Sequence, residues 1–339
     1  MRLAVELHGT LLGHLEGSDS RTADFHPSEE GIAAFGVGSR VLSVAIPLTP
    51  VLPRHHAARR RTWFVELMPE GDQLEYMLAQ AAVRRGDILG FLAHYGRDIA
   101  GAVQLWDVDD PTEPRTPGLE AVDRTGIRRL LEEPQVAPLG NEVRVGKTSL
   151  AGVQPKIVLA RVQGSWNRVI GGYPSTHILK PRVSARPTSI YDEEYGSRLA
   201  RSLGLLDYAT DIVDFDGLDA LVVERFDREG EVTLAPAYDV VPMTHLSGVD
   251  GRLALAVGGE YLHGRVTVEH LESELTRWGL RRSRALVEST LEELRSAALR
   301  EEPLAGAHGG LADDVVRFAT NLLDGRAAGE SAGQDARSR

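Results

Sequence analysis

The residues that could do chemistry gather between positions 149 and 239. The first group is Ser149–Lys156, SLAGVQPK, a turn of small residues that ends in a lysine before an apolar strand. Backbone N–H groups in such a turn can approach an anion closely, and Lys156 adds a positive charge. The segment matches neither the Walker pattern nor the dinucleotide-binding fingerprint, so by itself it is also compatible with an ordinary loop.

A second lysine, Lys180, ends the apolar segment THILK, and Glu194 lies on the helix that is expected to follow. Kinase-type phosphotransferases place a strand lysine on the nucleotide phosphates and hold it with a helix glutamate. The order of elements fits that chemistry. A lysine that reaches the surface and a solvated glutamate are the alternative.

Two later segments complete the group. Residues 222–228, VVERFDR, form an apolar strand that ends in charge, where backbone groups could bind an adenine edge; a solvated strand exit is the alternative. Residues 234–241, LAPAYDVV, place a single acid in an apolar run. Such an acid must be paired, hydrogen-bonded or metal-bound, and Mg²⁺ prefers carboxylate oxygen, so Asp239 is the best metal candidate.

Other reaction classes find little support. The chain has no cysteine, its 11 histidines show no HExxH spacing, and no Gly-x-Ser-x-Gly elbow occurs. Thiolate chemistry is excluded, and zinc or serine hydrolase chemistry is disfavoured. A net charge of −11 disfavours autonomous nucleic-acid binding. The one basic patch, residues 54–61, is either a solvated face or a contact for an anion or an acidic partner.

The elements that must position these residues fall into blocks. Residues 1–106 are predicted to form a small α/β subdomain that opens with a hairpin of alternating strands. Residues 107–121 contain three prolines and no periodicity, which predicts a linker extending over 107–139. The chain start lacks a signal peptide's apolar region and no run approaches the ~20 apolar residues of a membrane span, so a cytoplasmic location is expected.

Residues 140–228 read as mostly antiparallel strands. Hairpins are expected around Gly164-Ser165 and Asp216-Gly217, and apolar residues at intervals of four from Tyr191 to Leu203 predict one helix between them. Residues 229–325 become helical from Thr267, and residues 326–339 are expected to be disordered. Together the blocks predict an α+β protein.

Taken in order, these segments resemble the HipA family of toxin kinases over about residues 1–325. The resemblance rests on the following stretches: FVELMPEG (64–71), GRDIAGAV (96–103), SLAGVQPK (149–156), THILK (176–180), EEY (193–195), VVERFDR (222–228), LAPAYDVV (234–241) and LALAVGGE (253–260). It implies a bilobal protein-kinase-like fold with an N-terminal α/β subdomain and a kinase-like N-lobe over 140–228. Residues 229–325 would then be an internally truncated C-lobe.

The resemblance also implies functional roles. ATP would be bound by Ala151, Gly152, Val153, Gln154, Pro155, Lys156, Lys180, Glu224, Arg225, Phe226, Tyr238 and Asp239. Within this set, Lys180 would pair with the phosphates with Glu194 in support, Glu224–Phe226 would form the adenine hinge, and Asp239 would hold Mg²⁺. Ser149 matches the family's autophosphorylated serine. Family members are toxins paired with a HipB-like DNA-binding antitoxin, so DNA contact would be indirect, and the protein substrate would be a translation factor or an aminoacyl-tRNA synthetase.

One departure from the family pattern affects the predicted activity. The family carries a helical segment and an Asp-x-His-x-x-x-Asn-type catalytic loop before LAPAYDVV, whereas here only residues 227–238 separate Phe226 from Asp239. Twelve residues span at most about 40 Å and cannot supply that loop. No catalytic Asp is therefore assigned, since His245 and Asp250 follow no family position. The sequence predicts an impaired kinase, with a non-enzymatic pseudokinase that binds nucleotide or antitoxin as the alternative.

Overall fold

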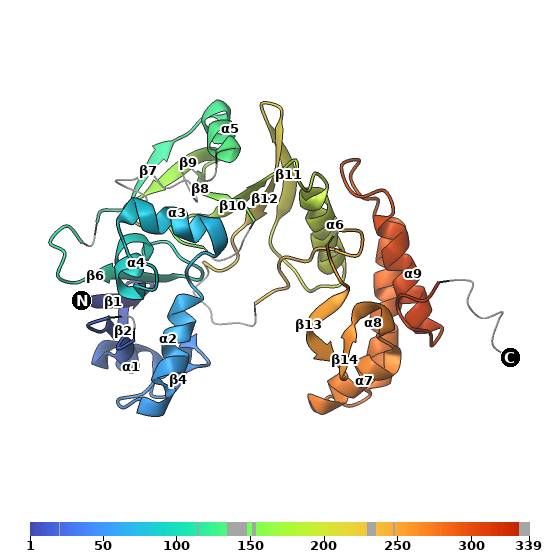
Figure 1. Cartoon of the computed structure of the whole chain (residues 1–339), viewed down its shortest axis with the longest axis horizontal. Coiled ribbons are helices and arrows are strands. Elements are labelled where there is room, and N and C mark those ends of the chain that lie inside the picture. The colour runs from blue at the N-terminus through green and yellow to red at the C-terminus, as the bar shows by residue number, and fades with distance from the viewer. Residues whose placement is uncertain are drawn as a thin grey trace. The chain divides into compact units, whose positions relative to one another are not determined.

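The computed structural model describes residues 1–19, 21–113, 115–133, 148–150, 154–228, 235–246 and 248–331. The chain divides into two compact units, shown with their elements in Figure 1. The first comprises Met1–Pro181 and Val213–Ala235, and the second comprises Arg182–Ile212 and Pro236–Arg339. Helices and antiparallel sheets occupy separate segments, which confirms the predicted α+β class.

The first unit begins with a four-stranded antiparallel sheet in the order β3-β2-β1-β6. Its alternating pattern buries Leu3 and Val5 on the face covered by helices. The strands are β1 (Arg2–Leu7), β2 (Thr10–Glu16), β3 (Asp24–Pro27) and β6 (Val103–Asp107). The intervening elements are α1 (Glu29–Phe35), β4 (Ser39–Ser43), β5 (Ile46–Leu48), η1 (Arg54–His56), α2 (Ala57–Val65), α3 (Gly71–Ala81) and α4 (Ile88–Tyr95).

The same unit contains a six-stranded sheet in the order β11-β12-β10-β8-β9-β7. The strands are β7 (Gly118–Ala121), β8 (Ile157–Val162), β9 (Ser165–Ile170), β10 (His177–Pro181), β11 (Thr210–Phe215) and β12 (Leu218–Glu224). Both predicted hairpins are present. Their turns take left-handed φ angles, 49° and 83° at Gln163-Gly164 and 54° and 94° at Asp216-Gly217, which suit a two-residue turn ending in glycine.

The predicted linker over 107–139 is wrong for residues 118–132. Strand β7 pairs with β9 at the edge of the sheet, and α5 (Arg124–Glu132) buries Ile127 and Leu131 in the sheet's core. The prolines that indicated a linker all precede β7, and a four-residue edge strand is too short to show a clear period. Linker composition therefore describes only the stretch before residue 118.

The N-terminal subdomain and the six-stranded sheet share one hydrophobic core. Leu150 and Val158 are buried in the same cluster as Leu3, Phe64 and Phe91. Burial of apolar surface across this boundary holds the two parts in one compact unit.

The second unit contains a helix from the middle of the chain and the C-terminal elements. They are α6 (Ser189–Ser202), β13 (Arg252–Val257), β14 (Glu260–Leu262), η2 (His263–Arg265), α7 (Val268–Arg277), α8 (Ser283–Arg300) and α9 (Leu311–Leu323). Helix α6 occurs where the four-residue periodicity predicted it. It packs Tyr195 and Leu199 against Ala298 and Leu311, and so belongs with the C-terminal helices although the sequence placed it among the strands.

Within the described residues, no helix is long and apolar enough to cross a membrane. The disorder predicted from position 326 is wrong for residues 326–331, because Ala328 is buried and its N–H donates to Val266 O at 2.9 Å. The rest of the predicted tail lies outside the described residues, which end at position 331.

Candidate functional site

Two buried lysines lie at neighbouring strands of the six-stranded sheet, Lys180 on β10 and Lys156 directly before β8. Strands β8 and β10 are antiparallel and their pairing ends with Ile157 opposite Leu179, so Lys156 and Lys180 are the residues next to that last pair. Each lysine is only 7% exposed. Residues directly opposite in a ladder project from the same face of the sheet. Two ammonium groups therefore lie at the position that the sequence analysis assigns to the ATP phosphates. Their positive charge is compatible with binding a polyphosphate.

Lysine usage is a signal that the motif analysis missed. Of the 38 basic residues in the chain only three are lysines, at positions 147, 156 and 180, and the rest are arginines. A lysine carries a compact point charge on a flexible stem, whereas arginine presents a wide planar fork. Lys156 and Lys180 therefore differ in shape and hydrogen-bonding geometry from the other basic side chains that the structure describes.

Ser149, the predicted autophosphorylation site, is completely buried. Its hydroxyl donates to Leu67 O at 2.9 Å, and its backbone N–H donates to Asp98 O at 3.0 Å. A phosphate group would bring about two negative charges into this closed site, so phosphorylation requires Ser149 to leave it. The predicted phosphate-loop residues 151–153 lie outside the described residues, whereas the half-buried Gln154 and Pro155 lead into Lys156.

The predicted adenine hinge contains one residue with a structural role. Glu224 ends β12 opposite His177 and is exposed. The Arg225 N–H donates to Thr176 O at 2.9 Å, and its guanidinium is buried and bound to protein groups. Glu224 and Phe226 therefore stay as predicted nucleotide contacts, and Arg225 supports the strand.

In the second unit, the buried Glu194 has one oxygen engaged and one orphaned. Its Oε1 accepts from Arg198 Nε at 2.8 Å, and its Oε2 is buried without a hydrogen-bond partner among the described residues. A buried carboxylate oxygen of this kind is costly unless a donor reaches it. Because Lys180 belongs to the other unit, the pairing of Glu194 with Lys180 stays a prediction.

Asp239 is exposed, contrary to the burial expected from its apolar neighbours. Its backbone has a φ of +52°, a left-handed conformation that Asp tolerates better than most residues. Neighbouring contacts hold its segment: Ala237 N–H donates to Leu205 O at 2.7 Å, and the Tyr208 hydroxyl donates to Ala237 O at 3.1 Å. Burial, helped by the charge of Asp239, raises the pKa of Tyr208 to about 12, so the phenol stays a donor at neutral pH. Tyr238 is 60% exposed.

The described residues contain no group of three or more histidine, aspartate or glutamate side chains that could hold a metal ion. This does not conflict with the prediction for Asp239, because Mg²⁺ commonly keeps several waters and binds one or two carboxylates together with substrate phosphates.

His245 and Asp250, which follow no family position, both have structural contacts. His245 Nε2 lies 2.9 Å from Asp192 Oδ2, and its ring stacks on His308 at 4.0 Å between centroids. Asp192 is fully buried and also accepts the His308 N–H. Asp250 accepts the Arg252 N–H within its turn. These contacts favour the reading in which neither residue serves as a catalytic base.

The basic patch at residues 54–61 is smaller than its sequence indicates. Arg60 is buried and forms two hydrogen bonds of 2.7 Å with the Asp24 carboxylate, so it anchors α2 to β3. Arg54 and Arg59 remain exposed.

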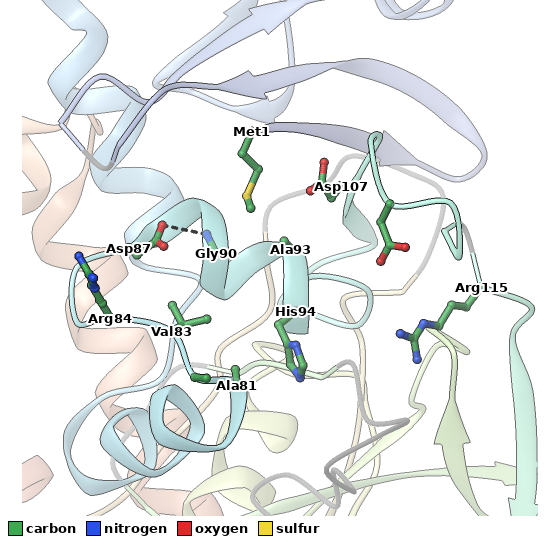
Figure 2. Close-up of a pocket in the computed structure, with 12 residues that line it drawn as sticks. Met1, Ala81, Val83, Arg84, Asp87, Gly90, Ala93, His94, Asp107 and Arg115 are labelled. Carbon is green, nitrogen blue, oxygen red and sulfur yellow. Dashed lines mark hydrogen bonds between the residues drawn. The ribbon is translucent and has the colours of Figure 1, made fainter.

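A cavity of about 540 Å³ lies in the N-terminal subdomain (Figure 2). Asp107 and Arg115 line it with opposite charges, and Asp87 nearby accepts the Gly90 N–H at 2.9 Å, which caps α4. None of the described residues predicted to bind ATP lines this cavity. It is therefore separate from the predicted nucleotide site.

The fold and the site together define an α+β protein in which an N-terminal subdomain is packed on an antiparallel sheet with a paired-lysine face. Comparisons with known proteins agree with this class. Residues 3–106 match the family model of the HipA N-terminal domain, and residues 148–233 match that of the HipA-like C-terminal domain. The chain belongs to the HipA family.

Similar proteins cover only parts of the sequence. Y4mE of Sinorhizobium fredii is 32% identical over 195 residues, which is 54% of this chain and 46% of that protein. The serine/threonine-protein kinase toxin HipA of Shewanella oneidensis is 31% identical over 187 residues, 54% of this chain and 42% of that protein. This chain thus spans less than half the length of either relative.

The fold is similar over nearly the whole chain to a solved structure. A chain in the Shewanella oneidensis complex of HipA, HipB and operator DNA matches with a TM-score of 0.70 and 20% identity. The match covers 95% of this chain and 96% of that chain.

Proposed function

We propose that this protein is a HipA-like serine/threonine kinase toxin that binds ATP and Mg²⁺ but transfers phosphate poorly or not at all. The observation that carries the nucleotide site is the placement of Lys156 and Lys180, both buried, next to the last residue pair of the β8–β10 ladder. Family membership and the similar kinase toxin of Shewanella oneidensis support the reaction class.

In this proposal each residue acts on a particular part of the nucleotide. Lys156 and Lys180 hold the phosphates, and Glu224 and Phe226 position the adenine. Asp239 holds Mg²⁺, which neutralises charge that develops on the transferred phosphoryl group. Because positioning and electrostatics dominate phosphoryl transfer, this set can bind nucleotide without efficient turnover.

Impairment follows from the short connection between Phe226 and Asp239. The described residues of that connection, 227–228 and 235–238, form no helix or strand. The Asp base and Asn metal ligand of the family's catalytic loop have no counterpart there. We infer that the alternative, a pseudokinase that regulates a complex, follows if transfer is fully lost.

A HipB-like DNA-binding antitoxin is the proposed partner, because the structural neighbour comes from a complex of HipA with HipB and operator DNA. DNA contact would then be made through the antitoxin, in keeping with the net charge of −11 on this chain. A translation factor or an aminoacyl-tRNA synthetase remains the proposed substrate class.

The decisive experiment incubates the purified chain with γ-labelled ATP and Mg²⁺ and measures label in the protein. We expect incorporation no higher than in Asp239→Asn, because loss of a general base alone costs about 10² to 10⁴ in rate. Calorimetric titration of the same sample should still show ATP binding. Robust labelling that disappears in both Ser149→Ala and Asp239→Asn would show that the short connection does not impair the kinase.

Gly196 of α6 should control how Asp239 meets the metal. A Cβ at this position would lie 1.9 Å from Val240 O, so Gly196→Ala must displace the segment that carries Asp239. We expect the gain in ATP affinity on adding Mg²⁺ to fall about tenfold, with Mg²⁺-free binding unchanged. Gly126→Ala in α5 is the control, since its Cβ meets only side-chain atoms of Val122 and Asp123. An unchanged Mg²⁺ response in Gly196→Ala would remove Asp239 from the metal site.

A further inference from the structure

Two segments that the sequence treats as separate motifs form one buried ion network. Arg225, from VVERFDR, donates to Ile99 O at 2.8 Å, and Ile99 belongs to GRDIAGAV. Asp227 accepts from Arg225 at 2.7 Å and from the Gly101 N–H at 2.6 Å. Arg228 donates to Asp98. Arg225, Asp227 and Arg228, which follow β12, thus bind the N-terminal subdomain through hydrogen bonds and an ion pair.

Asp98 extends this network to the segment that contains Ser149. Its Oδ2 accepts the Thr148 hydroxyl at 3.0 Å, and its backbone oxygen accepts the Ser149 N–H at 3.0 Å. Its Oδ1 is engaged by Arg228 and by the Ser175 N–H. Both Asp98 and Thr148 are only 1% exposed. The Asp98 carboxylate therefore binds Arg228, which follows the predicted hinge, with one oxygen, and Thr148, which precedes Ser149, with the other.

We propose that Asp98 is the positioning residue that seats Thr148–Leu150, the residues directly before the predicted phosphate loop, on the N-terminal subdomain. The proposal rests on the proposed nucleotide site, because Leu150 directly precedes the residues assigned to the phosphates. It goes beyond that assignment by making the N-terminal subdomain a structural part of the nucleotide site. It also gives a physical link between the segments GRDIAGAV and VVERFDR. Arg228 fixes the orientation of the Asp98 carboxylate, and this orientation allows Asp98 to accept the Thr148 hydroxyl.

The physical argument depends on charge as well as shape. Arg225 and Arg228 both form ion pairs with the Asp98 carboxylate and fix its position. A charged acceptor forms a stronger hydrogen bond with a hydroxyl than a neutral one does. Replacing Asp98 by Asn keeps the size but removes that charge. Asp227 still neutralises Arg225 in this variant, so the fold should persist.

The test compares amide hydrogen exchange of residues 148–150 in the full chain and in four variants. Asp98→Asn and Thr148→Val should accelerate exchange in this segment about tenfold or more, because the first weakens the buried hydrogen bond by removing the acceptor's charge and the second removes the hydroxyl donor. Thr148→Ser keeps the hydroxyl and should restore the slow exchange. Asp24→Asn is the matched control, because it weakens a buried Asp–Arg pair in the same subdomain that does not contact Thr148. Peptides from β1 should stay protected in all variants.

Titration with ATP provides the second measurement. Asp98→Asn and Thr148→Val should raise the dissociation constant several-fold, and Thr148→Ser should not. Equal exchange at 148–150 in Thr148→Val, Thr148→Ser and the unaltered chain would overturn the proposal. If the unaltered chain binds no ATP, the proposed nucleotide function fails, while the exchange measurement still decides whether Asp98 seats the segment.

Discussion

Lys180→Met should weaken ATP binding by about tenfold to a hundredfold, which corresponds to the loss of one charged hydrogen-bonding partner of the phosphates. Methionine keeps most of the volume of the buried stem, so the loss reports the ammonium group and not a cavity. The dissociation constant measured by calorimetry at fixed Mg²⁺ and ionic strength provides the test.

Two further variants sharpen that result. Lys180→Arg should also bind ATP poorly, because the wide, planar guanidinium does not fit the buried position of the compact lysine ammonium. Arg161→Ala removes an exposed positive charge from neighbouring β8 and serves as the control, with an effect within about twofold. If Lys180→Met binds ATP as tightly as the unaltered chain, Lys180 is a structural residue and the proposed phosphate site is wrong.

Arg225→Met should lower the free energy of unfolding of the first unit by about 3–5 kcal/mol, the typical cost of removing one partner from a buried ion pair. The Arg225 side chain is 1% exposed, as is that of Asp98. Its removal leaves Asp98 and Asp227 without their shared cation. Denaturant unfolding at pH 7 followed by tryptophan fluorescence measures the loss.

The pH for this measurement follows from Asp227. Burial alone would raise the pKa of its carboxyl, but the hydrogen bond and charge of Arg225, the charge of Arg228 and the Gly101 N–H lower it from 3.8 to about 2. A carboxyl whose pKa is lowered by folding stabilises the fold when the pH is above the pKa that the carboxyl has in the unfolded chain. This contribution is lost as the pH falls from about 4 to about 2. The difference between Arg225→Met and the unaltered chain should therefore be complete at pH 7 and shrink towards pH 2.

A second substitution separates charge from packing. Adding Asp227→Asn to Arg225→Met removes one uncompensated charge and should recover part of the lost stability. A cost below about 1 kcal/mol for Arg225→Met alone would show that the network contributes little to the fold. The role proposed for Asp98 would then depend on Arg228 alone.

Local patterns accounted for the two hairpins of the six-stranded sheet, the opening hairpin and helix α6. The turn at Asp216-Gly217 is found where the sequence predicts it, and the turn predicted at Gly164-Ser165 is found one residue earlier, at Gln163-Gly164. A two-residue turn with left-handed φ angles depends mainly on its own residues. The linker prediction failed at 118–132 since β7 is stabilised by pairing with β9 and not by its own pattern. Helix α6 was found by its period, but its packing partners, such as Leu311, are over 100 positions away in the chain.

By itself the sequence determined the two hairpins, helix α6, the family motifs and the candidate lysines, because residue type and spacing carry these directly. Only the tertiary structure decided which motif residues face a ligand and which hold the fold together. Arg225 belongs to the predicted hinge, yet it is buried and donates to Ile99 across 126 positions of the chain. Burial and hydrogen bonds between residues far apart in the sequence arise from tertiary packing, so the local sequence pattern does not predict them. For the same reason Asp98, an ordinary motif residue in the sequence, became the centre of the network in the structure.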